Sequence, residues 1–316
     1  MTALEVTELS KTFPVGGGLF RKAGEVRAVR PMSFKVETGE TLGIVGESGC
    51  GKSTLARMLV GLIEPTTGHI EIEGRPLDNA DPAAFGKLIQ YVFQDPVSSL
   101  NPRKTIRQIM EAPLKRLHGM DRAQRTARIG EIFASVNLRD EFLDRYPHEF
   151  SGGQAQRIGV ARALAASPRI MVLDEPVSAL DVSVQAQVLN LLAELRRGFN
   201  LTYLFISHDL AVVEAVSDRI MVLYFGTVVE IGRAEDLFKS PRHPYTKLLS
   251  ASAPVVGRPL AAPEQADSEL PDPLRPPPGC AFAGRCLRAT ERCRTAEPKL
   301  KPLGEHQLAA CHHPLE

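Results

Sequence analysis

One stretch decides the fold of this chain: Gly46-Glu47-Ser48-Gly49-Cys50-Gly51-Lys52-Ser53-Thr54, which matches the pattern G-x-x-x-x-G-K-[ST]. A buried-strand pattern, Thr41–Val45, precedes it, and an apolar helical pattern over 55–63 follows it. The glycines let backbone N–H groups converge on phosphate oxygens, and the helix N-terminus adds about half a positive charge. The stretch predicts a nucleotide-binding phosphate loop in which Lys52 reaches the outer phosphates and Ser53 binds magnesium.

Outward from this loop, short β-branched runs alternate with helical stretches up to about residue 240. Such alternation is typical of a parallel sheet flanked by helices. The expected strands are 4–9, 26–36, 42–45, 89–93, 170–173, 203–206 and 220–223. Between about 96 and 147 no strand pattern occurs, and helices are expected over 105–117 and 122–136. We therefore predict an α/β nucleotide-binding domain with a helical insert.

Composition excludes several classes of protein. Of the 316 residues, 43% are hydrophobic and 24% are charged, which rules out a disordered, collagenous or membrane-spanning chain. The 38 Lys and Arg nearly balance the 37 Asp and Glu, so the net charge of +1 gives no reason to expect nucleic acid as a partner. No run reaches the roughly 18 apolar residues of a membrane helix. The first residues also lack a signal-peptide pattern, so we expect a cytoplasmic protein.

The last 76 residues differ from the rest, because they contain 13 of the 24 prolines and four of the five cysteines. The segment 255–278 is rich in Pro and Ala and is expected to be a linker. The cysteines that follow are Cys280, Cys286, Cys293 and Cys311. Cytoplasmic proteins seldom keep structural disulfides, so this cluster indicates a metal site. Zinc sites usually include a C-x-x-C pair and ferredoxin spacing differs, so three readings stay open: an iron–sulfur cluster, zinc with His312 or His313, and free thiols.

Two carboxylates end the apolar strand 170–173, about 120 residues after the phosphate loop. Hydrolysis of a phosphate bond needs a held magnesium ion and a group that orients the attacking water. Asp174 is expected to face the metal and Glu175 the water. Cys50, within the loop, is interpreted as a small side chain at a variable position rather than as a redox group.

Further motifs resemble those of ABC-type ATPases. Phe150-Ser151-Gly152-Gly153-Gln154 is similar to the family's signature, in which Leu usually stands first. Gln94 resembles the Q-loop glutamine, Asp181 the D-loop aspartate and His208 the switch histidine. Phe13 is similar to the aromatic residue that stacks on adenine. All of these motifs occur in the family's order.

This resemblance implies a RecA-like parallel-sheet core with an antiparallel β-subdomain and a helical subdomain. It also implies a head-to-tail pair of domains, in which each ATP lies between one phosphate loop and the partner's signature helix. Asp181 then communicates between the two domains, and Glu175 and His208 are the catalytic residues. Magnesium is held by Ser53, Gln94 and Asp174. The implied nucleotide-binding residues are Phe13, Ser48, Gly49, Cys50, Gly51, Lys52, Ser53, Thr54 and Gln94.

Three segments resemble the ATP-binding subunits of bacterial oligopeptide and dipeptide importers. Such importers usually carry two non-identical ATPases, and the segments are most similar to the second. They are 93–103, 146–149 and 240–246, the last containing His243-Pro244-Tyr245-Thr246. By itself this tetrapeptide is more typical of a helix start than of a ligand site. The resemblance divides the chain into an ATPase domain (1–240, with its helical insert at about 96–165), an extension and linker (241–279) and a Cys-rich metal-binding tail (280–316).

The same resemblance implies ATP, Mg²⁺ and a [4Fe–4S] cluster at the four cysteines of the tail. The implied partners are a second ATPase subunit, two transmembrane permeases and an extracytoplasmic peptide-binding protein, with no nucleic acid. The chain is then a peripheral protein on the cytoplasmic face of the cell membrane. Alternatives are the same role for nickel, glutathione or cell-wall peptides, an ABC ATPase acting on DNA or ribosomes, and a stand-alone ATPase.

Overall fold

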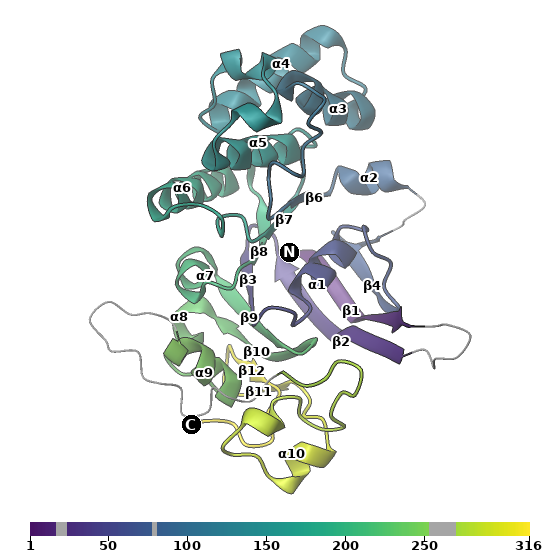
Figure 1. Cartoon of the computed structure of the whole chain (residues 1–316), viewed down its shortest axis with the longest axis vertical. Helices are drawn as coiled ribbons and strands as arrows, with labels where there is room; N and C mark the ends of the chain where they lie inside the picture. Colours follow the sequence, from purple (N-terminus) through teal and green to yellow (C-terminus); the bar gives the residue numbers. More distant parts are fainter. Residues whose placement is uncertain (17–23, 78–80, 253–269) are drawn as a thin grey trace. The chain divides into compact units, whose positions relative to one another are not determined.

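A computed structural model of the chain describes residues 1–16, 24–77, 81–252 and 270–316 (Figure 1). They form two compact units, each made of several segments. The first unit contains Met1–Glu5, Lys35–Thr41 and Glu71–Ile206, and the second contains Val6–Phe34, Leu42–Ile70 and Ser207–Glu316. Most of the predicted linker at 255–278 lies outside the described residues.

The first unit contains three parallel strands, β6 (Ile89–Val92), β7 (Ile170–Asp174) and β8 (Thr202–Ile206). In register, Ile89 of β6 lies opposite Ile170 of β7, and Val172 of β7 lies opposite Leu204 of β8. Every residue of β7 and β8 is buried, as expected for parallel strands that are covered on both faces. These strands confirm the sequence prediction, and β7 delivers Asp174 at its carboxyl end.

The helices of this unit follow the predicted insert. Figure 1 shows α3 (Ile106–His118), α4 (Arg122–Ser135) and α5 (Gly152–Leu164) gathered together. Each begins with a capping box, in which the residue before the helix and the third helical residue bond each other's backbone N–H. The predicted helices 105–117 and 122–136 are thus confirmed to within one residue at each end. The unit's other helical segments are α2 (Pro82–Gly86), η1 (Asp140–Asp144), η2 (Pro147–Glu149) and α6 (Val182–Phe199).

In the second unit, residues 42–45 of β3 (Thr41–Val45) run parallel to β9 (Arg219–Tyr224), which turns back antiparallel into β10 (Thr227–Arg233). Two short tail strands extend this sheet: β12 (Leu308–Ala309) pairs with β10, and β11 (Lys301–Pro302) pairs with β12. The sequence analysis did not predict β10, because a charged residue and a glycine interrupt its apolar pattern. The cysteine-bearing tail is therefore anchored to the sheet by backbone hydrogen bonds.

A four-stranded sheet has the order β2 (Gly24–Glu37), β1 (Thr2–Val15), β4 (Thr67–Ile72) and β5 (Arg75–Pro76). The sequence analysis missed β4 and made β1 too short. Hydrogen bonds explain the longer β1, since the Thr12 N–H donates to Thr66 Oγ1 at 3.0 Å. A contact with Thr66, the residue before β4, thus supports β1 beyond its apolar pattern.

The remaining helical segments of the second unit are α1 (Lys52–Leu59), α7 (Leu210–Val216), α8 (Ala234–Leu237), α9 (Pro244–Ser252), η3 (Ala283–Arg285) and α10 (Glu291–Thr295). Helix α1 starts three residues before the predicted 55–63 and ends four residues earlier, because Gly61 follows with the left-handed φ of 69° that closes helices. Helix α9 begins at Pro244, as the tetrapeptide predicts. Within the described ranges, no helix combines the length and apolar character needed to span a membrane.

Candidate active site

The phosphate loop has the predicted strand–loop–helix setting between β3 and α1. Gly51 precedes α1 with a φ of 103°, and a Cβ atom there would lie 2.3 Å from the Ala28 carbonyl oxygen. Only glycine fits this position. Lys52 is buried, at 6% exposure, and its ammonium donates to the carbonyls of Gly46 at 2.6 Å and Glu47 at 3.0 Å. The loop and its lysine therefore form a compact hydrogen-bonded turn.

Glu47 is the only acidic residue of the loop, and two distant residues hold it. The Glu47 N–H donates to the Tyr245 hydroxyl at 3.0 Å, while Arg285 Nη1 donates to both Glu47 carboxylate oxygens, at 3.0 and 2.9 Å. The sequence analysis did not identify these contacts. The carboxylate inside a phosphate loop was the one sequence signal for a cationic partner. No residue near Glu47 in the sequence indicates that this partner is Arg285.

The acidic pair lies at the end of β7, in the first unit. Asp174, 4% exposed, accepts a short hydrogen bond from the Tyr91 hydroxyl, a contact that sequence analysis missed. The Gln94 side-chain amide donates to Glu175 Oε2 at 2.8 Å, so two residues predicted from separate motifs meet. Glu175 has a left-handed φ of 47°, unusual for a residue with a side chain, and its N–H donates to the Ile206 carbonyl at 2.8 Å. The backbone thus fixes the direction of this carboxylate.

The signature residues open α5 as predicted. Ser151 Oγ accepts from the Gln154 N–H at 3.4 Å, and Gln154 Oε1 accepts from the Ser151 N–H at 3.1 Å. A Cβ atom on Gly153 would lie 2.5 Å from Val184 Cγ1, on α6. Close packing of α5 on α6 therefore requires glycine here.

The other predicted site residues lie in separate places. Asp181 is exposed and immediately precedes α6, and His208 is exposed just after β8. Phe13, in β1, is partly buried, with the Lys11 ammonium 5.2 Å from its ring centre. The roles that the family resemblance gives these residues stay predictions.

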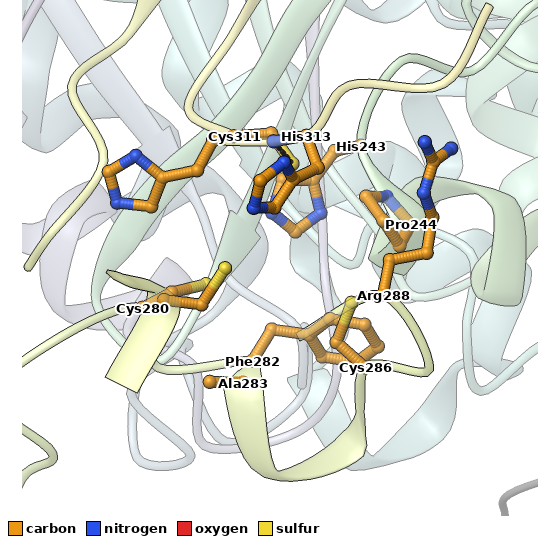
Figure 2. Close-up of a pocket in the computed structure, with 11 residues that line it drawn as sticks. His243, Pro244, Cys280, Phe282, Ala283, Cys286, Arg288, Cys311 and His313 are labelled. Atoms are coloured by element: carbon orange, nitrogen blue, oxygen red, sulfur yellow. Dashed lines mark hydrogen bonds between the residues drawn. The ribbon is translucent and has the colours of Figure 1, made fainter. Parts of the chain in front are cut away.

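The tail brings its four cysteines to one pocket. Figure 2 shows Cys280, Cys286 and Cys311 around it, and Cys293 also lines it. In the described part of the chain, however, no three His, Cys, Asp or Glu side chains are grouped so that they could hold a metal ion. Burial raises the pKa of the Cys280 thiol to about 11. The metal-binding tail therefore stays a prediction.

Cys50 is 2% exposed, and its sulfur lies 3.9 Å from the Lys52 ammonium. Burial raises the pKa of this thiol, and the opposing effect of Lys52 is smaller. A buried thiol with a raised pKa is a poor nucleophile. The geometry favours the interpretation of Cys50 as a small packing side chain.

Comparison with known proteins places these motifs in a family. Residues 29–178 match the ABC transporter family, and residues 229–293 match the family described as oligopeptide/dipeptide transporter, C-terminal region. The oligopeptide transport ATP-binding protein AppF of Bacillus subtilis is 47% identical over 98% of this chain and 97% of its own length. The chain belongs to the ABC transporter family.

Other relatives of this ABC protein are also similar over nearly the whole chain. The dipeptide transport ATP-binding proteins DppF of Haemophilus influenzae and Escherichia coli are each 48% identical over 98% of this chain, and the alignments cover 96% and 93% of the relatives. A dimeric ATP-binding cassette solved in a post-hydrolysis state with ADP and Pi is 29% identical, with a TM-score of 0.65 over 73% of this chain and 98% of that one. The ATPase family and fold that the motifs predict are confirmed.

Proposed function

We propose that this ABC protein hydrolyses ATP to drive the import of peptides through a membrane transporter. The observation that carries this proposal is the match of 229–293 to the oligopeptide/dipeptide transporter C-terminal region. Relatives named for oligopeptide and dipeptide transport, aligned over nearly the whole chain, support it. The proposed division into ATPase domain, extension and tail follows the same family pattern.

The roles of the site residues are part of this proposal. Lys52 and the loop from Ser48 to Thr54 bind the phosphates of ATP, and Phe13 stacks on the adenine. A magnesium ion suits the hydroxyl, amide and carboxylate oxygens of Ser53, Gln94 and Asp174, because this hard cation prefers oxygen ligands. When bound, it neutralises charge on the phosphates.

Glu175 and His208 complete the chemistry that we propose. Glu175, held by Gln94, orients the attacking water and accepts its proton. His208 contacts the terminal phosphate. Ser151, Gly152, Gly153 and Gln154 bind the ATP of a partner domain through the start of α5, a helix N-terminus that favours anions, and Asp181 signals to that partner.

Partners and location follow from the same proposal. We infer a second, non-identical ATPase, two permeases and an external peptide-binding protein, with this chain on the cytoplasmic face of the membrane. The four tail cysteines supply a soft sulfur donor set that suits iron–sulfur chemistry or zinc. We propose that a [4Fe–4S] cluster binds there and stabilises the short tail, with release of the thiol protons.

The test is peptide uptake by cells that carry the Lys52→Ala variant in place of the natural chain. Loss of uptake, with the variant still co-purifying with two permeases and a second ATPase from solubilised membranes, is the expected result. Unchanged uptake would contradict the energising role. Uptake of nickel and of glutathione by the same Lys52→Ala cells identifies the solute. Loss of nickel uptake instead of peptide uptake would favour the alternative cargo.

A further inference from the structure

The carboxylate of Glu47 poses an electrostatic problem in a loop that we propose binds phosphates. A negative side chain at this position repels the negative phosphates of ATP unless a cation neutralises it. Lys52 does not serve this purpose, because its ammonium contacts the carbonyl oxygens of Gly46 and Glu47 rather than the carboxylate. The neutralising cation comes instead from the tail.

Arg285 is fixed in place to supply that charge. Its side chain is 12% exposed, and Nη1 lies 3.0 and 2.9 Å from the two Glu47 carboxylate oxygens. The guanidinium carbon lies 5.9 Å from the Tyr224 ring centre and 5.8 Å from that of Phe282. Contact with aromatic faces suits a planar guanidinium and restricts its motion. Arg285 therefore holds the carboxylate in one direction.

Tyr245 holds the backbone of the same loop residue. Its ring is fully buried, 4.5 Å from the Tyr224 ring centre and 5.4 Å from that of Phe282. Its hydroxyl accepts the Glu47 N–H at 3.0 Å. A single aromatic cluster thus carries both contacts, and all of these residues belong to the second unit. The C-terminal part of the chain fixes the entry to the phosphate loop at its side chain and at its main chain.

We propose that Arg285 is a positioning residue for ATP binding, which neutralises and orients Glu47 so that the phosphate loop accepts the phosphates. Tyr245 supports the same residue through its backbone. This inference rests on the proposed role of the loop and is independent of the transported solute. It assigns the Cys-rich tail a direct part in nucleotide affinity, because Arg285 lies between Cys280 and Cys286 in the sequence and contacts Glu47 directly.

The test is a double-mutant cycle on the purified full-length chain, with the dissociation constant of a fluorescent ATP analogue as the readout. Arg285→Met keeps the apolar stem against the rings and removes the charge. We expect this change to weaken binding about tenfold, the cost of leaving one charge of a half-buried pair uncompensated. In a Glu47→Gln background the same change should alter binding by less than about twofold, since no charge remains to be neutralised.

Equal loss of affinity in both backgrounds, or no loss in either, would overturn the proposal. Glu297→Gln is the matched control, because it removes the 2.9 Å ion pair between Glu297 and Arg30. This pair also joins the tail to β2, but it does not involve Glu47. The affinity of this variant for the ATP analogue should stay unchanged. Lys52→Ala separates the two hypotheses, because retained binding in that variant refutes the role of the loop itself.

Tyr245→Phe decides the question should Arg285→Met fail to fold. It keeps the buried ring and removes only the hydroxyl that accepts the Glu47 N–H. We expect weaker nucleotide binding by about three- to fivefold, corresponding to the loss of one hydrogen bond. Unchanged affinity in a folded Tyr245→Phe chain contradicts the proposal that this part of the chain positions the loop.

Discussion

At the scale of single residues, this ABC protein holds Glu175, which we propose as catalytic, through a few strong contacts. Glu175 is held at two points, by a hydrogen bond from Gln94 at 2.8 Å and by its own N–H bond to Ile206. Its backbone has a left-handed φ of 47°, which residues with a side chain seldom adopt. Such backbone strain often accompanies a residue whose direction matters for function.

Glu175→Gln tests the role of this carboxylate. The change keeps the size of the side chain but removes the group that accepts the proton of water, so ATP hydrolysis should fall by a factor of about 100 or more. Binding of ATP should persist. Phosphate release and the dissociation constant of ATP are the measurements.

The control for that variant is Glu194→Gln, the same chemical change at an exposed position of α6. Its hydrolysis should equal that of the natural chain. Undiminished hydrolysis in Glu175→Gln would show that another group activates the water.

At the scale of secondary structure, the start of α5 is shaped by its contact with α6. The capping box of Ser151 and Gln154 fixes the first turn, and Gly153 lets Val184 approach. An alanine at 153 improves helix propensity by roughly 1 kcal/mol. Its Cβ atom at 2.5 Å from Val184 Cγ1 nevertheless forces a stiff, β-branched side chain to move.

Gly153→Ala should therefore destabilise the chain by roughly 1–3 kcal/mol, because overpacking outweighs the gain in propensity. Adding Val184→Ala should recover most of that loss by removing the obstructing methyl groups. Gly130→Ala in α4 is the matched control, since a Cβ atom there meets nothing within 4 Å. This control should raise the free energy of unfolding, measured in urea, or leave it unchanged. A Gly153→Ala chain with an unchanged free energy of unfolding would refute the packing argument.

At the scale of the whole chain, the C-terminal tail is joined to the ATPase fold in several ways. Strand β12 pairs with β10, Arg285 pairs with Glu47, and Glu297 pairs with Arg30. The tail is short, and a short segment gains stability when it binds a metal ion. The four cysteines that line one pocket are the residues that we propose as its ligands.

The proposed cluster predicts iron in protein purified without oxygen, together with a visible absorption band. Cys293→Ser should lose both, because it removes a buried sulfur from the pocket, and should lower the thermal midpoint of unfolding. Cys50→Ser, which alters the one cysteine of the phosphate loop, should keep its iron. Zinc in place of iron would support the alternative metal, and metal-free protein of normal stability would leave the cysteines as plain thiols.

Sequence alone determined the phosphate loop, the parallel strands and the helical insert. These features depend on local constraints: glycines where the chain bends sharply, apolar residues at the period of a strand or helix, and capping residues three positions apart. The family motifs are equally local, since each is a short run next to a strand or helix end. For this reason the amino-acid order is enough to propose roles for Gln94, Glu175 and the signature residues.

Only the tertiary structure decided which distant residues meet. Arg285 and Glu47 are 238 positions apart, and Tyr91 and Asp174 are 83 apart. Strand β10 lacks a clear pattern because Glu230 and Gly232 interrupt its apolar residues, and only its pairing with β9 and β12 shows that it belongs to the sheet. Such contacts arise from the packing of whole elements, which leaves no periodic trace in the chain. The physical support of the phosphate loop by the C-terminal tail therefore became visible only in three dimensions.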